Sequence, residues 1–389
     1  MLNKTNIFKI LMIFATMFII YGFLVAFDYF FHLQKYKSYK LANEIITGRK
    51  QNEDRKYILD AKDLGYEFIV YPYLYADNKN LKEFAEKLEI IPVNGQPNSK
   101  VYYCNEGYGL IKFKTDRLGF RNNDIVWDKI SGSQKKIVFI GDSYTQGACV
   151  KENEPISSYF DDYVTYNLGL DGNNPAIYSS LSKLFIPKIK PDFVVQLFYV
   201  NDFNERNEDF FAKNLKVPNL EERYFKNNSS IELSNEILDI INNAKIIMTE
   251  IPNRLPGERP NVLVRGARYL TLPTLRMYFS LIYNKYFFQL SSTTKYSMKI
   301  LKETCLKNDC EPIIGFITNS PYWEPNPLTE KFKNQVKDFT LKNDINFIDF
   351  TEEINSLGDS ARAPKGTHMS PAGYKIIADK IRKVLSDFN

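Results

Sequence analysis

The stretch Ile137-Val-Phe-Ile-Gly-Asp-Ser-Tyr-Thr-Gln-Gly147 decides the fold of this chain. Its first four residues are apolar and mostly β-branched or aromatic, which predicts a buried strand. Gly141, Asp142 and Ser143 then end that strand, so Ser143 stands at its carboxyl end. In an open α/β sheet this is the edge at which ligands bind. Gly, Asp and Ser are also common turn residues, so the stretch alone predicts only a strand followed by a turn.

Strand-like and helix-like segments alternate from residue 135 onward. We predict strands at 135–140, 164–168, 193–200, 312–318 and 345–350. We predict helices at 156–163, 175–188, 293–307, 328–342 and from Pro371 onward, with Ser370 as the cap of the last helix. Such alternation folds into a parallel sheet covered on both faces. The expected fold class is therefore α/β, a three-layer αβα arrangement with a five-stranded parallel sheet of flavodoxin-like type.

An apolar segment lies close to the amino terminus. Residues 10–27 carry no charge and reach the lower length limit for crossing a bilayer. No small-x-small cleavage motif precedes Asp28, which favours an uncleaved transmembrane anchor over a signal peptide. Lysines lie on both sides of the segment, so the positive-inside rule does not decide the orientation. Because one N-terminal anchor usually exports the domain behind it, we expect a single-pass membrane protein with an extracytoplasmic main domain, periplasmic in a Gram-negative cell.

The pattern divides the chain into three regions. We expect the anchor at 1–32, a polar stalk and a small α+β leader at 33–134, and the main domain at 135–389. Residues 203–290 interrupt the alternation as a helical insertion, whose apolar spacing predicts an amphipathic helix over 237–251 ended by Pro252. The aromatic part of the insertion, 277–288, fits a lid or a surface near the membrane. Simple packing on the main domain is the favoured alternative.

Charge and cysteine content exclude several functions. The 389 residues hold 51 Lys and Arg against 46 Asp and Glu, and no dense basic run with interleaved aromatics occurs, so we expect no nucleic-acid partner. Without a Cys-x-x-Cys pair and with only two histidines, we expect no metal site and no cofactor. Cys305 and Cys310 either form a disulfide in an oxidising compartment or stay as free thiols. Cys149 is expected to be buried.

Four polar or small residues follow predicted strands. Ser143 follows the first strand, Gly172 the second, Asn201 the third and His368 the fifth. The carboxyl ends of parallel strands share one edge, so these residues should converge. A serine nucleophile needs a nearby base, and His368 is the histidine placed to serve, because His32 borders the membrane segment. A glycine N–H and an asparagine amide can donate to an oxyanion.

The blocks that carry these residues resemble those of a known family. Gly141-Asp-Ser143, Asn167-Leu-Gly-Leu-Asp-Gly172, Asn201-Asp202 and Gly366-Thr-His-Met-Ser-Pro-Ala-Gly373 are similar to four blocks of the SGNH (GDSL-type) hydrolases. The resemblance covers 135–203 and 290–389. It implies that Ser143 is the nucleophile and His368 the general base. It also implies an oxyanion hole formed by the N–H groups of Ser143 and Gly172 and the side chain of Asn201. Asp142 is assigned a structural role.

One position departs from the family pattern. The family usually places an aspartate three residues before the histidine, and Lys365 stands there in this chain. Lysine cannot accept the imidazole N–H. Three alternatives stay open. The site works as a Ser–His dyad oriented by a backbone carbonyl or water, or Asp359, Asp349 or Glu352 supplies the acid, or hydrolysis has been lost.

The resemblance and the expected topology together imply a function. We expect a serine esterase that removes or transfers O-acyl groups, O-acetyl on a cell-surface polysaccharide above all, through an acyl-Ser143 intermediate. The partners would be an acylated glycan or another ester, the membrane, and a polysaccharide export or acylation machinery. Alternatives are an O-acyltransferase on the same glycan, a glycan-binding module that has lost turnover, and a lipase with 203–290 as its lid.

Overall fold

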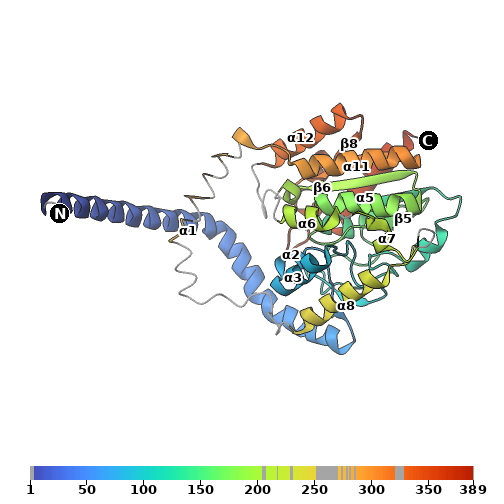
Figure 1. Ribbon diagram of the computed structural model, residues 1–389, viewed down its shortest axis with the longest axis horizontal. Helices are drawn as coiled ribbons and strands as arrows, with labels where there is room; N and C mark the ends of the chain where they lie inside the picture. The colour runs from blue at the N-terminus through green and yellow to red at the C-terminus, as the bar shows by residue number, and fades with distance from the viewer. Residues whose placement is uncertain are drawn as a thin grey trace. The chain divides into compact units, whose positions relative to one another are not determined.

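The computed structural model describes residues 4–203, 207–216, 218–227, 231–250, 270–272, 275–276, 279, 282–283, 286–319 and 328–388. The chain forms two compact units (Figure 1). One consists of Met1–Arg55 with Asn253–Phe288, and the other of Lys56–Pro252 with Gln289–Asn389.

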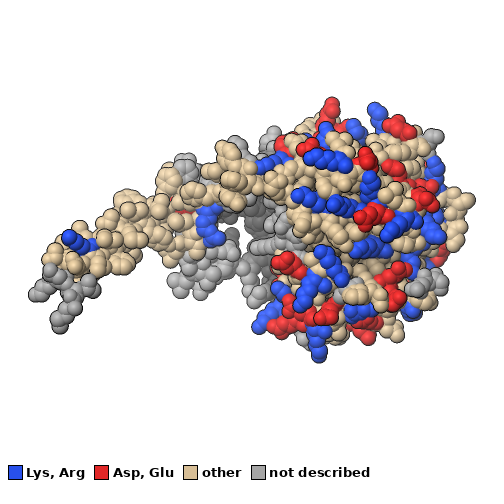
Figure 2. All heavy atoms as spheres, turned by 45° about the horizontal axis from the view of Figure 1, so that its top comes forward, with Lys and Arg blue, Asp and Glu red and all other residues tan. Residues whose placement is uncertain are grey.

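A long helix, α1 (Lys4–Asp63), contains the apolar segment. Its stretch Thr5–Phe30 is long and apolar enough to cross a membrane, and includes the predicted 10–27. The 26 residues rise roughly 39 Å at 1.5 Å per residue, more than the roughly 30 Å of a hydrocarbon core. Large apolar side chains such as Phe18, 78% exposed, cover its surface. Figure 2 shows this stretch nearly free of charges, whereas both signs mix over the other unit.

The main sheet has five parallel strands, as predicted. They are β4 (Lys136–Ile140), β5 (Val164–Asn167), β6 (Phe193–Tyr199), β7 (Glu311–Ile317) and β8 (Asn346–Asp349). The strand order is β5-β4-β6-β7-β8, and all neighbouring pairs are parallel. Every residue of the central strand β6 is buried, Gln196 included, as expected of a strand covered on both faces.

Helices cover both faces of this sheet. They are α5 (Pro175–Ile189), α11 (Ser292–Asn308), α12 (Thr329–Lys342) and α14 (Pro371–Ser386). On one face α5 and α11 lie side by side (Figure 1), and Phe332 of α12 contacts Phe198 and Phe316. On the other face, Leu197 belongs to one apolar cluster with Ile377 of α14. The three-layer α/β prediction is confirmed.

Three local features differ from the prediction around these elements. The segment 156–163 forms only a short 3-10 helix, η2 (Ile156–Tyr159), because Ser158 bonds back to Pro155 and Phe160 is not helical. The short helices α4 (Ser143–Gln146) and α13 (Thr351–Ser356) were not predicted. The predicted cap of α14 is present, since the Ser370 hydroxyl accepts the Gly373 N–H at 3.0 Å.

The leader is α+β, as predicted. Its elements are β1 (Glu67–Phe68), α2 (Leu74–Asp77), α3 (Lys79–Leu88), β2 (Lys100–Tyr102), β3 (Lys112–Lys114) and the 3-10 helix η1 (Asp124–Lys129). β1 pairs with β2 in parallel and β2 with β3 in antiparallel fashion. The part of the leader from Lys56 belongs to the same compact unit as the main sheet. The division at residue 134 stays a prediction.

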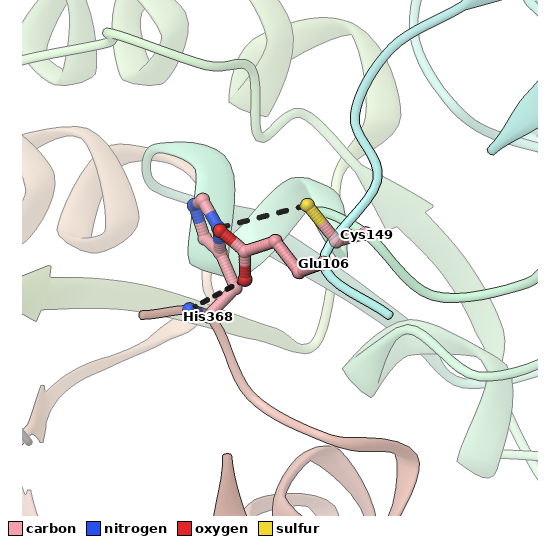
Figure 3. A group of neighbouring side chains, drawn as sticks. All are labelled: Glu106, Cys149 and His368. Atoms are coloured by element: carbon pink, nitrogen blue, oxygen red, sulfur yellow. Dashed lines mark hydrogen bonds and ion pairs between the residues drawn. The ribbon is translucent and has the colours of Figure 1, made fainter. Parts of the chain in front are cut away.

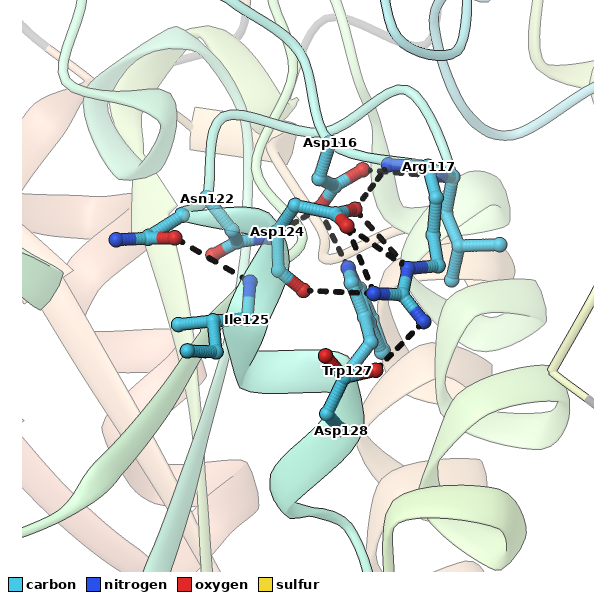
Figure 4. Close-up of polar contacts among 9 residues, drawn as sticks. Asp116, Arg117, Asn122, Asp124, Ile125, Trp127 and Asp128 are labelled. Carbon is cyan, nitrogen blue, oxygen red and sulfur yellow. Dashed lines mark hydrogen bonds and ion pairs between the residues drawn. The ribbon is translucent and has the colours of Figure 1, made fainter.

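The turn that ends the leader is built around Asp116. Its carboxylate accepts the N–H groups of Leu118 and Phe120, both at 2.9 Å, and the indole N–H of Trp127 at 2.8 Å (Figure 4). Burial raises the pKa of Asp116 to about 6, although these hydrogen bonds oppose the shift. Next to it, Arg117 pairs with Asp124 at 2.7 Å. Side-chain hydrogen bonds thus hold the turn that leads toward the main sheet.

The first part of the insertion, through Glu250, belongs to the same compact unit as the main sheet. It contains α6 (Glu208–Leu215), α7 (Leu220–Tyr224) and α8 (Asn235–Glu250). In α8, Ile237, Ile241 and Ala244 are buried, which confirms the predicted amphipathic helix, and α8 contacts α3 and α7. Pro252 and six of the twelve residues 277–288 lie outside the described residues, and the other six belong to the unit that contains Met1–Arg55. The lid hypothesis for that segment stays a prediction.

Candidate active site

Ser143 begins the short helix α4, directly after β4, and is 4% exposed. Asp142 caps this turn, because one carboxylate oxygen accepts the Tyr144 N–H at 2.9 Å. The other oxygen accepts an amide N–H of Asn201 at 3.0 Å. Asp142 therefore has the structural role that we predicted, and it joins the loops after β4 and β6.

The Ser143 hydroxyl faces His368. Its Oγ lies 3.0 Å from Nε2 of the imidazole. The imidazole packs at 45° against the ring of Tyr144, with centroids 5.0 Å apart. The Tyr144 hydroxyl in turn donates to the Thr367 carbonyl at 3.0 Å, and its ring stacks on Tyr199. Packing thus fixes the imidazole beside the serine, as the sequence predicts.

The other ring nitrogen of His368 meets an acid from the leader. Glu106 Oε1 lies 3.0 Å from Nδ1, and Oε2 accepts the backbone N–H of His368 at 3.0 Å (Figure 3). A carboxylate can only accept, so Nδ1 carries the proton and the Nε2 lone pair faces Ser143. Serine, histidine and glutamate therefore form the chain of contacts that a catalytic triad requires.

Glu106 was not among the acids proposed from sequence. Asp359 and Glu352 are exposed, and Asp349 pairs with Lys333 at 3.1 Å. Lys365 is exposed too, and its backbone N–H donates to the Glu106 carbonyl at 2.9 Å. Lys365, which stands where an aspartate was expected, therefore holds the segment of Glu106 through its backbone N–H.

Gly366 provides the space for the Glu106 carboxylate. A Cβ at residue 366 would lie 1.7 Å from Cδ of Glu106. No other residue type fits without displacing the acid. This glycine, two residues before the histidine, could have indicated from sequence that an acid from another segment packs there. It does not show which residue that acid is.

The charge of Glu106 governs the titration of His368. Burial alone lowers the pKa of an imidazole. The hydrogen bond to Glu106 and its negative charge outweigh that effect, with smaller contributions from Asp171 and Asp142, so the pKa of His368 is raised above 6.5. The charged form of the imidazole is stabilised accordingly.

The loops expected to hold an oxyanion meet beside Ser143. Gly172 has φ +69°, a left-handed conformation that favours glycine. The backbone next to it is held by Gln146 of α4, whose side chain accepts the Asp171 N–H at 3.2 Å. Asn201 is exposed and, since its amide nitrogen carries two N–H groups, it keeps a second donor besides the one on Asp142. The donors named from sequence thus come from three adjoining loops.

Two leader side chains clamp these loops. The guanidinium of buried Arg121 donates to the carbonyls of Gly147 at 2.5 Å and Val150 at 2.7 Å. Burial lowers the pKa of Arg121 to about 10, so it stays charged at neutral pH. The Asn122 side chain donates to the Asn167 carbonyl at 3.0 Å and accepts its N–H at 2.7 Å. The leader therefore holds both the segment after Ser143 and the end of β5.

Tyrosines of the leader border Gly172. A Cβ at Gly172 would lie 2.7 Å from Cβ of Tyr73 and 3.7 Å from the ring of Tyr71. The hydroxyl of Tyr103 hydrogen-bonds to the Asp171 carboxylate, whose pKa is raised by burial. All three tyrosines are partly exposed. Aromatic faces and a carboxylate therefore lie next to the predicted oxyanion donors.

The cysteines form disulfides. Cys305 pairs with Cys310, which is one of the two predicted alternatives, and buried Cys149 pairs with Cys104 of the leader. Ligand atoms of Glu106, Cys149 and His368 lie within 4.8 Å of one another, as a metal site would need. However, the thiolate is the form of cysteine that binds metals, and the Cys149 sulfur is bonded to Cys104. The group is therefore a poor fit to a metal ion.

The comparisons with known proteins concern solved structures. No family model matches the sequence, and no curated protein matches it. The chain is similar to a GDSL-like lipase from Bacteroides thetaiotaomicron at 13% identity, over 66% of this chain and 90% of that one, with a TM-score of 0.37. It is similar to a catalytic mutant of an acetylxylan esterase from Geobacillus stearothermophilus at 14% identity, over 65% and 94%, with a TM-score of 0.34. Several matched structures carry the GDSL name, the family that the sequence blocks resemble.

Proposed function

We propose that this protein is a serine esterase of SGNH type. One observation carries the proposal: Ser143 Oγ lies 3.0 Å from His368 Nε2, and His368 Nδ1 lies 3.0 Å from Glu106 Oε1. A buried serine aligned on a histidine, which is itself aligned on a carboxylate, is the geometry of an activated nucleophile. Because Glu106 supplies the acid, the lysine at position 365 is no longer a reason to expect that hydrolysis has been lost.

The proposed reaction proceeds in two steps. Ser143 Oγ attacks the ester carbonyl while His368 Nε2 takes its proton, and the N–H groups of Ser143 and Gly172 with the Asn201 amide hold the oxyanion. The intermediate collapses to acyl-Ser143, and the imidazolium protonates the departing alcohol. Water, or a sugar hydroxyl in a transferase, then attacks the acyl group, with His368 again taking the proton.

The alcohol part of the substrate is proposed to be a sugar. Tyr71, Tyr73 and Tyr103 offer partly exposed rings beside Gly172, and Asp171 offers a hydroxyl acceptor. Such rings provide flat apolar contact area with polar tips, which suits an O-acetylated glycan better than a long acyl chain. The machinery for exporting or acylating that glycan is the proposed partner.

The proposed location is the outer side of a membrane, with α1 as the anchor. Two disulfides support an oxidising compartment, because cytosolic thiols are kept reduced. A protease-protection assay on spheroplasts, from which any outer membrane has been removed, tests this. Protection of the main domain from an added protease would place it in the cytoplasm and overturn this part of the proposal.

The activity is tested on the full-length protein in detergent micelles. We expect hydrolysis of p-nitrophenyl acetate that Ser143→Ala abolishes, and covalent labelling of Ser143 by a fluorophosphonate. Asp387→Asn, on the terminal turn, is the matched control and should keep full activity. No turnover and no labelling in the parent would refute the esterase and favour a glycan-binding module. Addition of a glycan acceptor separates hydrolysis from transfer, since a transferase forms acylated glycan instead of acetate.

A further inference from the structure

The segment that carries Glu106 has little regular structure of its own. Glu106 lies between β2 and β3, each only three residues long. Backbone hydrogen bonds pair Cys104 with Ile111 across this hairpin and Glu106 with Lys365, both within 3.0 Å. By contrast, Ser143 and His368 adjoin a sheet strand and a long helix.

A disulfide fastens this segment to the nucleophile loop. Cys104 stands two residues before Glu106, and its partner Cys149 stands six residues after Ser143. Cys149 is fully buried, and Arg121 holds the carbonyl on either side of it. The bridge therefore connects the hairpin that carries Glu106 to the loop that follows Ser143.

The same disulfide touches the histidine. The Cys149 sulfur lies 3.7 Å from Nδ1 of His368, the nitrogen that contacts Glu106 (Figure 3). The bridge thus borders the imidazole on the side of the acid. It restricts both the approach of Glu106 and the position of the ring.

We infer that the Cys104–Cys149 disulfide is the positioning element that holds Glu106 against His368. Without it, the leader hairpin separates from the imidazole and the site behaves as a Ser–His dyad. Activity then depends on an oxidising compartment, although the nucleophile and the base need no cysteine. This inference rests on the proposed esterase function for its kinetic consequences, but not for the contact itself.

The chain provides a matched control in its other disulfide. Cys305–Cys310 joins the end of α11 to the start of β7, five residues apart, at the edge of the sheet away from Ser143. If disulfides only stabilise the fold, removing either pair has the same kind of effect. If the inference is right, removal of the Cys104–Cys149 pair alone reproduces the loss of Glu106.

The experiment compares four variants of the full-length protein. They are Cys104→Ala with Cys149→Ala, Cys305→Ala with Cys310→Ala, Glu106→Gln, and the first pair combined with Glu106→Gln. For the first pair we expect kcat/KM on p-nitrophenyl acetate to fall roughly 10³-fold, as for Glu106→Gln, with the acid limb of its pH profile moved to lower pH. Adding Glu106→Gln should then cost less than about threefold more, because coupled groups are not additive. The control pair should lower Tm without moving the acid limb.

A second readout does not require turnover. The chain has only two histidines, so imidazole NMR resolves His368, with His368→Gln as the assignment control. Removal of the Cys104–Cys149 pair should lower the titration midpoint of His368, as Glu106→Gln does. A parent without turnover that still shows this shift refutes the esterase and keeps the inference. The inference is overturned if removal of the Cys104–Cys149 pair leaves the titration midpoint of His368 unchanged and Glu106→Gln lowers kcat/KM as much in that variant as in the parent.

A chemical route covers the case in which the first pair does not fold. Tris(2-carboxyethyl)phosphine with water cleaves the S–S bond to two thiols and becomes the phosphine oxide, so it accounts for both electrons and protons. Thiol trapping and mass spectrometry identify which bridge has opened. Loss of activity should follow the opening of Cys104–Cys149, and reoxidation should restore it. Full activity with that bridge open contradicts the inference.

Discussion

Replacement of Glu106 by glutamine is the sharpest test of the site. Glutamine keeps the shape of the side chain but removes its charge. It also lets the amide present an N–H to Nδ1, which would move the imidazole proton to Nε2, the nitrogen that must accept from Ser143. The perturbation therefore affects both the stability of the imidazolium and the tautomer of the neutral ring.

The size of the effect follows from the contact distance. Glu106 Oε1 and His368 Nδ1 are 3.0 Å apart, which puts the charge centres at roughly 4 Å. At an effective dielectric constant of about 20 their attraction is about 4 kcal/mol. At 1.36 kcal/mol per tenfold change in rate, its loss lowers kcat/KM roughly 10³-fold. A shifted tautomer adds to this, and the corresponding Asp→Asn change in serine proteases costs about 10⁴-fold.

The pH dependence has a definite sign. Glu106 raises the pKa of His368, and burial without that charge lowers it. The base is active only when neutral, so in Glu106→Gln the acid limb of kcat/KM should move to lower pH. The stability that Glu106 gives to the charged imidazole is present below the unfolded pKa of histidine. It is lost as pH rises through the raised folded value.

The assay is p-nitrophenyl acetate hydrolysis by the full-length protein between pH 5 and 9. Glu352→Gln and Asp359→Asn are the matched controls, because both remove exposed carboxylates near His368 in sequence and should leave kcat/KM within about twofold. Circular dichroism checks that the fold is kept. A Glu106→Gln variant within about threefold of the parent, with an unmoved acid limb, would refute the assignment of the acid.

Three further predictions follow from the same geometry. Gly366→Ala places a methyl group on the Glu106 carboxylate and should lower kcat/KM almost as far as Glu106→Gln. The double variant should be no slower than Glu106→Gln alone, and additive losses would contradict this. Arg121→Met leaves two carbonyls without their charged donor and should cost about 3 kcal/mol in urea unfolding, whereas a loss below about 0.5 kcal/mol would show that the clamp is unimportant. Lys365→Asp should not raise kcat/KM, because Glu106 already accepts the hydrogen bond from Nδ1 of His368. A several-fold gain would indicate that an acid at residue 365 can still orient the imidazole.

Local patterns predicted most of the main domain. The run at Phe193–Tyr199 is apolar except for Gln196, because the central strand is covered on both faces and both rows of its side chains are buried. Ser370 and Pro371 predict the start of α14, because a helix cap depends only on residues that are neighbours in the sequence.

The sequence by itself determined the sheet, the loop edge and the pairing of Ser143 with His368, because parallel strands bring their carboxyl ends together whatever the side chains between them. Only the tertiary structure decided the acid. Glu106 and His368 are separated by 262 residues, and their contact depends on how a small leader docks on the main sheet. No local periodicity encodes that docking. The docking brings Cys104 to Cys149 and the Glu106 carboxylate to Gly366. Each of these contacts joins residues far apart in the sequence, so neither can be recognised before the chain is folded.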